Sequence, residues 1–423
     1  MKFENFGSVT IYQLSTLPLV LLIGSLVIWF AGCTGNPTLT SEPHTYFTSV
    51  MPLTGDITQT KKILVFLDGT ANNPGSETNV WKLYQRINNN SDRQTTAIYI
   101  AGVGSAESAP LTEAVLGHGM EERILDGYRF IVENYTPKDE IMLFGFSRGA
   151  HQARTLAGLI SYAGIMQLTD DVGSVATDSN RIIELVKKQR DADHILEWHT
   201  WSKNQPPILA TEISRKLGIQ VLPASIKFLG VWDTVPGSSL KNYGVCKEDI
   251  GVVKDNLSFF IPGVDRGERY KTDSYPAISY IAHAVSLDEK RSKFAPLLVC
   301  DPIVADLTTV NETWFPGAHA DVGGGYEDSN DLSNLSLNWM IEQLKRHYTL
   351  SPEPPYASDP AGLAHWSMED KPANAMSKCS DRVPPLNSQI HQSVSARRSM
   401  GAVPVRWKGE KKWMAYPIGC KQQ

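Results

Sequence analysis

The feature that most constrains the fold is the pentapeptide GFSRG at residues 145–149, which places Ser147 between two glycines. An apolar run, IMLF, precedes it at residues 141–144, and a helix-prone stretch follows at residues 150–164. A sharp strand-to-helix turn lifts the serine hydroxyl clear of a sheet, and glycines two residues to either side avoid collisions with neighbouring backbone. The first N–H groups of the helix then face developing negative charge. This layout predicts a nucleophile elbow, with a glycine-rich turn of no catalytic role as the alternative.

Length and composition indicate a globular chain. With 423 residues, 42% of them hydrophobic and 20% charged, the chain can form one large α/β domain with insertions or two smaller domains. The net charge of -5 and the lack of long single-sign runs give no reason to expect nucleic acid as a partner. No Cys/His spacing typical of zinc sites occurs, so we expect neither a cofactor nor a metal.

The N-terminal segment differs from the rest of the chain. Residues 17–32 are almost wholly apolar and end in FAG before Cys33, which resembles a bacterial lipoprotein signal with a lipidated cysteine. Phe30, where leucine is preferred, and the single Lys2 offset by Glu4 depart from that pattern. We therefore predict that residues 1–33 are a signal peptide or membrane anchor that holds the protein in the cell envelope, facing the periplasm. An uncleaved anchor and a soluble cytoplasmic protein are the alternatives.

The remaining cysteines, Cys246, Cys300, Cys379 and Cys420, permit one or two disulfides after export, although free thiols are an equal alternative. Residues 34–60 are rich in Thr, Pro and Ser, which predicts a flexible tether.

Strand and helix patterns alternate from residue 61 onwards, as a parallel α/β sheet requires. Strands are predicted at residues 62–67, 97–100, 140–146, 225–232 and 313–315. Helices are predicted at residues 121–135, 150–164 and 335–348, and a helical insertion at 178–217. The expected fold is α/β-hydrolase-like, with a mostly parallel central sheet flanked by helices. The catalytic domain would span residues 61–408 and a basic tail residues 409–423.

A serine nucleophile needs a histidine to take its proton and an acid to orient that histidine. Asp233 follows a predicted strand, and His319 lies in the segment 316–325, which is too glycine-rich to predict regular structure. The order Ser147, Asp233, His319 is the chain order expected of α/β-hydrolases.

Other residues compete for these roles. His151 is four residues past the serine on the same predicted helix, and His283 lies in a helix-like pattern typical of a structural histidine. Asp288 and Asp321 are the alternative acids, but Asp321 is so close in sequence to His319 that hydrogen bonding within the loop is its expected task.

An oxyanion needs two donors. The backbone N–H of Arg148 is the natural first, and the turn at Gly69 and Thr70, after the first predicted strand, is the candidate for the second. The alternative is an ordinary strand-ending turn. Asp68, Asp321 and Asp328 could gather around a cation, but nothing in their spacing requires one.

Six ordered motifs between residues 61 and 406 resemble the α/β-hydrolase family that includes the type VI secretion phospholipase effectors of the first class and related uncharacterised bacterial and fungal proteins. The motifs are VFLDGT at 65–70, AGVG at 101–104, LFGFSRGA at 143–150, FLGVWDTV at 228–235, FPGAHADVGGGY at 315–326 and LSLNWM at 335–340.

The resemblance implies an esterase that acts on phospholipid acyl chains, with Ser147 as nucleophile, Asp233 as acid and His319 as base. The N-terminus favours a membrane-tethered lipase or esterase over a secreted effector. A soluble-ester esterase or thioesterase, and a non-catalytic binding protein on a hydrolase fold, remain alternatives.

The expected partners are a phospholipid or other ester substrate and a membrane surface. The basic and aromatic residues of the tail could rest on anionic headgroups, or could form a solvated edge. The sequence identifies no protein partner.

Overall fold

The computed structural model describes residues 46–420 except 91, 106–118, 169–174, 190, 236–273 and 370–376. The predicted signal or anchor at 1–33, residues 34–45 of the predicted tether and the last three residues of the predicted tail lie outside the described residues. Within the described chain, no helix is both long and apolar enough to cross a membrane.

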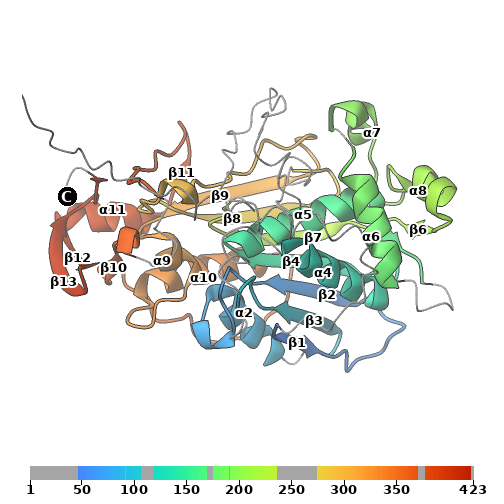
Figure 1. The fold of residues 1–423 in the computed structure, drawn as a ribbon. Helices are drawn as coiled ribbons and strands as arrows, with labels where there is room; N and C mark the ends of the chain where they lie inside the picture. The colour runs from blue at the N-terminus through green and yellow to red at the C-terminus, as the bar shows by residue number, and fades with distance from the viewer. Residues whose placement is uncertain are drawn as a thin grey trace, which may run out of the picture. The chain divides into compact units, whose positions relative to one another are not determined.

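A central eight-stranded sheet forms the core of the fold (Figure 1). Its strands, in spatial order, are β1 (Thr48–Met51), β3 (Thr95–Ile100), β2 (Lys62–Leu67), β4 (Glu140–Phe146), β7 (Ile226–Trp232), β8 (Tyr280–Ser286), β9 (Thr309–Phe315) and β11 (Gln389–Ile390). Only β1 pairs antiparallel, and every other neighbouring pair is parallel. The mostly parallel sheet confirms the predicted fold class.

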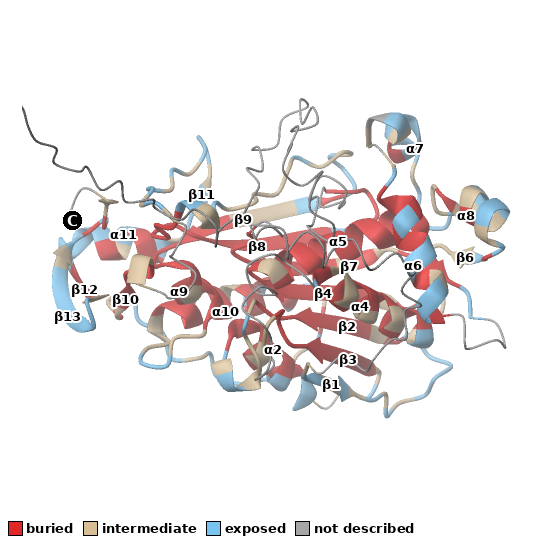
Figure 2. Ribbon diagram, viewed as in Figure 1, coloured by how far each residue is buried: buried red, intermediate tan, exposed pale blue. Residues whose placement is uncertain are grey.

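Helices cover both faces of the sheet. Because successive side chains of a strand point to opposite faces, Ile63, Val65 and Leu67 of β2 pack under α4 (Met120–Asn134), α5 (Arg148–Ala163) and α6 (Val175–Val186). Leu64 and Phe66 pack on the other face, with α2 (Asn79–Asn88) and α10 (Asp331–Leu344). The central strands are therefore buried on both faces, as Figure 2 shows.

The segment around 178–217, predicted as a helical insertion, is largely helical in the structure. It contains α6, α7 (Ile195–His199) and α8 (Ala210–Leu217), and a small antiparallel pair, β5 (Ile165–Met166) and β6 (Val221–Leu222), lies at its base. Trp198 of α7 is fully buried, with its ring 4.9 Å from those of Tyr162 and Tyr275. This anchors the insertion to the core of the domain.

Two strands lie outside the limits predicted for the domain, β1 of the central sheet and β13 (Glu410–Ala415) of a separate three-stranded sheet. β1 lies inside residues 34–60, the predicted tether, because its backbone pairs with the edge of β3 although its side chains are largely exposed. The predicted tail 409–423 begins with β13, which pairs with β12 (Ala402–Trp407); β12 in turn pairs with β10 (Ala364–His365). β13 is exposed (Figure 2) and its sequence is polar, so no hydrophobic pattern predicted it. The strand is stabilised by backbone pairing.

Two further local predictions were wrong. The region around His283 is the buried strand β8 and not a helix, because a strand covered on both faces loses the period-two alternation that identifies it. The segment 316–325 contains a short helix, α9 (His319–Gly323), in which the Asp321 carboxylate accepts the backbone N–H of Ala318 at 2.8 Å. The remaining short elements are α11 (Gln392–Ser399) and the 3-10 turns Pro74–Ser76, Asp191–His194, Ser292–Phe294 and Ser367–Glu369.

Candidate active site

Ser147 lies at the turn between β4 and α5, where the sequence predicted it. Its backbone has φ 59° and ψ -124°, a conformation that a residue with a side chain rarely adopts. Its N–H donates to the carbonyl of Trp232 at 3.0 Å, and the N–H of Val235 donates to its carbonyl at 3.4 Å. The strained turn is therefore held against the carboxyl end of β7.

The two flanking glycines are required by close backbone approach. A Cβ atom on Gly145 would lie 2.3 Å from the carbonyl oxygen of Gly149. A Cβ atom on Gly149 would lie 2.2 Å from the carbonyl oxygen of Leu67. Neither contact can relax through side-chain motion, because the opposing atoms belong to the backbone.

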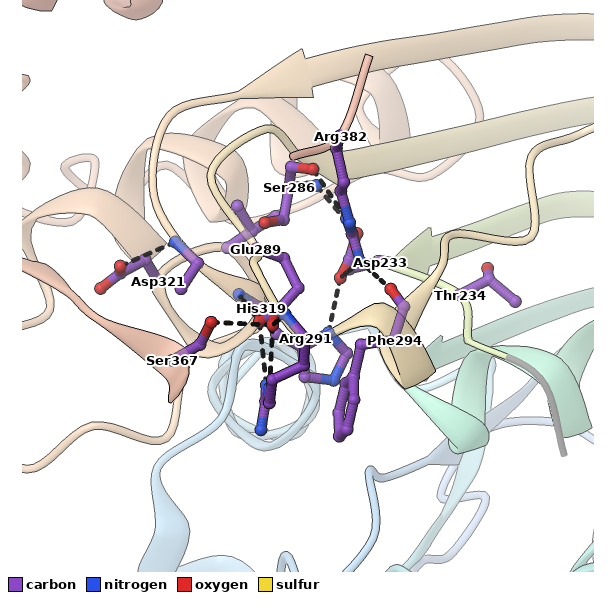
Figure 3. Close-up of polar contacts among 12 residues, drawn as sticks. Asp233, Thr234, Ser286, Glu289, Arg291, Phe294, His319, Asp321, Ser367 and Arg382 are labelled. Atoms are coloured by element: carbon purple, nitrogen blue, oxygen red, sulfur yellow. Dashed lines mark hydrogen bonds and ion pairs between the residues drawn. The ribbon is translucent and has the colours of Figure 1, made fainter. Parts of the chain in front are cut away.

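Asp233 and His319 are brought together. Asp233 follows the last residue of β7, and His319 is the first residue of α9; their side chains are buried, with Nδ1 of His319 2.5 Å from Oδ2 of Asp233. The imidazole packs against Phe146, the neighbour of Ser147, with ring centroids 4.6 Å apart. Figure 3 shows Asp233 between His319 and an arginine, Arg382.

Arg382 holds the carboxylate of Asp233 from the side opposite His319. Its Nη1 donates to Oδ1 at 2.6 Å and its Nη2 to Oδ2 at 3.0 Å, and the N–H of Ser286 donates to Oδ1 at 2.9 Å. Burial alone would raise the pKa of Asp233, but the charge of Arg382 and the hydrogen bond from His319 hold it well below its ordinary value. The acid is therefore ionised at neutral pH.

Burial lowers the pKa of His319 below its ordinary value, and the hydrogen bond to Asp233 opposes this only in part. The imidazole is neutral at pH 7. The carboxylate acceptor at Nδ1 assigns the ring proton to that nitrogen, which leaves a lone pair on Nε2.

Glu289 supports the backbone of His319, and sequence reasoning missed it. Its Oε2 accepts the His319 N–H at 3.1 Å, while Oε1 accepts the Ser367 hydroxyl at 2.8 Å and the Arg291 Nε at 2.8 Å. Burial raises its pKa, but Arg291, Arg382 and His319 together lower the pKa to about 2. Glu289 and Arg382 carry no motif that could have revealed them, since each acts through a contact between segments distant in sequence.

Among the described residues, the Ser147 hydroxyl makes no hydrogen bond with His319. This contact is often long in serine hydrolases without substrate and tightens when the substrate binds. The structure thus joins Asp233 to His319 and places Ser147 one residue from Phe146, on which His319 packs.

The predicted oxyanion turn lies against the serine. A Cβ atom on Gly69 would lie 3.2 Å from the Cβ atom of Ser147. The Gly69 N–H is already donated to Oδ1 of Asp68 at 2.7 Å, whereas the buried hydroxyl of Thr70 finds no partner among the described residues. Arg148 is the first residue of α5, where a backbone N–H has no partner within the helix. Thr70 and Arg148 are therefore better placed than Gly69 to donate to a bound group.

The alternative histidines occupy other environments. His151 is fully buried within α5. His283 is a buried residue of β8 whose Nδ1 lies 2.9 Å from Glu312 and whose Nε2 accepts the N–H of Thr234 at 3.1 Å. Both ring nitrogens of His283 thus serve structural contacts.

The alternative acids hold the loop that carries His319. Asp288 accepts the N–H of Gly317 at 2.7 Å and the hydroxyl of Tyr416 at 3.1 Å. Asp321 accepts the Ala318 N–H, as predicted, and its Oδ1 lies 2.6 Å from Nδ1 of His365.

Of the three aspartates considered for a cation, Asp68 shares no partner with the other two. Asp68 accepts hydrogen bonds from Tyr99 and Thr78, whereas Asp321 and Asp328 flank His365. In the described part of the chain, no three His, Cys, Asp or Glu residues form a group that could hold a metal ion.

Comparison with known proteins identifies relatives of this chain. It is 26% identical over 263 residues to an uncharacterised protein of Saccharomyces cerevisiae, a match that covers 56% of this chain and 32% of the relative. The chain thus spans about a third of the length of that curated relative.

Solved structures resemble the chain more distantly. An uncharacterised protein from Pseudomonas aeruginosa is 17% identical with a TM-score of 0.40, and the match covers 72% of this chain and 49% of that one. A butyrate-bound esterase from Thermogutta terrifontis is 12% identical with a TM-score of 0.40, and the match covers 73% of this chain and 91% of the esterase. The Tle1 effector bound to the VgrG spike of the type VI secretion system is 16% identical with a TM-score of 0.31, and the match covers 70% of this chain and 56% of the effector chain.

Residues 61–343 match the family described as the catalytic domain of Tle1-like phospholipase effectors of the type VI secretion system. That segment is more than half of the chain, and it contains Ser147, Asp233 and His319. The chain therefore belongs to the family of Tle1-like phospholipase effectors, through its catalytic domain.

Proposed function

We propose that this protein is a serine hydrolase that cleaves acyl esters of phospholipids through Ser147, Asp233 and His319. The observation that carries the proposal is the buried hydrogen bond between His319 and Asp233, in a chain of this phospholipase family whose Ser147 occupies a strained elbow. A serine is activated when a neutral imidazole accepts its proton while a carboxylate holds the imidazole in the correct tautomer.

The reaction follows from these positions. His319 Nε2 takes the proton from the Ser147 hydroxyl as Oγ attacks the ester carbonyl. The backbone amides of Arg148 and Thr70 stabilise the resulting oxyanion, with the Thr70 hydroxyl as a further donor. When the tetrahedral species collapses, His319 returns the proton to the departing alcohol and Ser147 retains the acyl group. Water, deprotonated by His319, then releases the fatty acid and restores the serine.

We also propose that the protein acts at a membrane in the cell envelope. The apolar segment ending at Cys33 supports a lipoprotein anchor, and the disulfide between Cys379 and Cys420 supports an oxidising compartment. Strand β13 exposes Trp413 between Lys412 and Met414, a combination suited to an anionic headgroup region. Mass spectrometry of Cys33, beside a Cys33→Ser variant, tests the anchor, and an unmodified cysteine in the mature protein would exclude lipidation.

The experiment for the chemistry uses the full chain in detergent, with a phospholipid that carries distinguishable acyl chains. We expect the wild-type protein to release fatty acid and to be labelled by a fluorophosphonate, and Ser147→Ala to lose both while remaining folded. Cleavage of short soluble esters without phospholipid cleavage would identify a general esterase or thioesterase. A folded protein that reacts with neither substrate nor label would be a binding protein on a hydrolase fold.

A further inference from the structure

Arg382 comes from a part of the chain that the family match does not include. The match ends at residue 343, and Arg382 lies in an irregular segment after residue 376. Even so, its side chain is buried and reaches the carboxylate of Asp233. A segment outside the matched domain therefore completes the surroundings of the predicted catalytic acid.

The contact of Arg382 with Asp233 is bidentate. Nη1 also donates to the carbonyl of Ser286 at 2.7 Å, and Nη2 also donates to the carbonyl of Phe294. A guanidinium fixed by two carbonyls and two carboxylate oxygens sets the plane of that carboxylate. In this orientation Oδ2 faces Nδ1 of His319 (Figure 3).

Backbone hydrogen bonds and a disulfide fix the residues that directly precede Arg382. Backbone hydrogen bonds of 2.9 Å join Ser292 to the carbonyl of Lys378 and Ser380 to the carbonyl of Lys290. Cys379, three residues before Arg382, forms a disulfide with Cys420. The crosslink joins positions 41 residues apart. It is the covalent constraint nearest to Arg382 in the described sequence.

We propose that Arg382 is a positioning residue for the hydrolysis, which clamps Asp233 in the orientation that serves His319, and that the Cys379–Cys420 disulfide holds Arg382 in place. This inference rests on the proposed function. The arginine acts through Asp233 and needs no contact with substrate. Its fork fixes the carboxylate, and its charge offsets the negative charge beside the imidazole.

Loss of the positive charge of Arg382 should shift the pKa of His319, an effect that a purely structural residue would not have. Without Arg382, the negative charge of Asp233 acts on His319 uncompensated, so that proton binding to the imidazole becomes more favourable. The acid limb of kcat/KM, which reports His319 in the free enzyme, should then move to higher pH. Of the described residues, Asp233, Arg291 and Glu289 act on the pKa of this imidazole, and the variants leave all three unchanged.

The test compares Arg382→Met, Arg382→Lys and Arg397→Met in the full chain, with kcat, KM, pH profile and thermal unfolding measured for each. Arg397 is the matched control, because it is fully buried and donates to the carbonyls of Pro360 and Gly362. We expect Arg382→Met to lower kcat by up to about 100-fold, as expected for a misplaced catalytic group, with little change in KM and with the acid limb at higher pH. Arg382→Lys should return the acid limb of kcat/KM to the wild-type pH but should not restore the full kcat. Lysine supplies the positive charge but cannot make the bidentate contact of the guanidinium.

Arg397→Met should lower the unfolding temperature and leave the acid limb in place. A wild-type acid limb in folded Arg382→Met would overturn the proposal. If Arg382→Met does not fold, Arg382→Lys decides: wild-type kcat in that variant would refute the need for a bidentate clamp. Wild-type protein that is inactive and unlabelled by fluorophosphonate would refute the proposed function instead, so the two failures are distinct.

The disulfide is tested with the double variant Cys379→Ser and Cys420→Ser. A reductant is not selective, because Cys300 is also disulfide-bonded. We expect the double variant to shift the acid limb in the same direction as Arg382→Met, with a smaller loss of kcat. A double variant with unchanged kcat and pH profile would refute the role of the disulfide.

Discussion

Nδ1 of His319 lies 2.5 Å from Oδ2 of Asp233, although the two residues are 86 positions apart in the sequence. The distance is short because the parallel strands β7, β8 and β9 end at the same edge of the sheet, and the connections after β7 and β9 carry the two residues. The arrangement holds the imidazole in the tautomer that leaves Nε2 able to accept a proton.

Replacing Asp233 with asparagine should lower kcat by about 10⁴-fold, as expected when the acid of such a triad no longer fixes the tautomer. Among the described residues no neighbouring carboxylate is free to substitute, since Asp288 is bound to Gly317 and Tyr416 and Glu289 to Arg291. Steady-state kinetics beside Ser147→Ala check this. A mild loss in Asp233→Asn would mean that another carboxylate reaches His319.

The pH profile of kcat/KM should rise through the pKa of His319, because only the neutral imidazole can accept the serine proton. Burial lowers that pKa below 6.5, so activity should already be near its plateau at pH 7. Asp233→Asn removes a negative charge that favours the imidazolium, so the residual activity should show its acid limb at still lower pH. This direction is opposite to that expected for Arg382→Met. An acid limb above pH 7 in the wild-type protein would contradict the assignment of His319 as the base.

Replacing Thr70 with valine should lower activity without lowering stability. Thr70→Val removes a buried hydroxyl that has no partner among the described residues, so the variant should be as stable as the wild type or slightly more so. If the hydroxyl stabilises the oxyanion, kcat of Thr70→Val should fall by about 10²-fold. Thr70→Ser keeps a hydroxyl and should retain most of the wild-type kcat. Kinetics and thermal unfolding of both variants check this. An unchanged kcat in Thr70→Val would leave only backbone donors for the oxyanion.

Sequence patterns predicted those parts of the fold that depend on local structure. The strand at 62–67 and the strand at 140–146 agree with β2 and β4, because apolar runs bounded by turn residues identify buried strands. Ser147, Asp233 and His319 were predicted as the catalytic residues because each follows a predicted strand or lies in a glycine-rich segment. Their chemical roles remain predictions until they are measured.

The features that were missed depend on contacts between distant segments. β1 and β13 are exposed strands whose side chains carry no periodic signal, so only the backbone partner reveals them. β8 was mistaken for a helix because it is buried on both faces. Arg382 and Glu289 lie in irregular segments, and no local pattern indicates that their side chains converge on Asp233 and His319.

Trp198 provides a test of the helical insertion. Its side chain is fully buried and packs against Tyr162 and Tyr275, and the insertion is therefore expected to be part of the rigid core. Trp198→Ala should lower the free energy of unfolding by about 3–5 kcal/mol, the usual cost of removing a buried tryptophan.

The matched control is Trp413→Ala, whose side chain is 69% exposed on β13 and whose loss should change stability by less than about 0.5 kcal/mol. Urea unfolding of both variants gives the two values. A Trp198→Ala variant as stable as the wild type would show that the insertion packs loosely and can move independently of the sheet, because a tryptophan that makes no firm contacts leaves no cavity when it is removed.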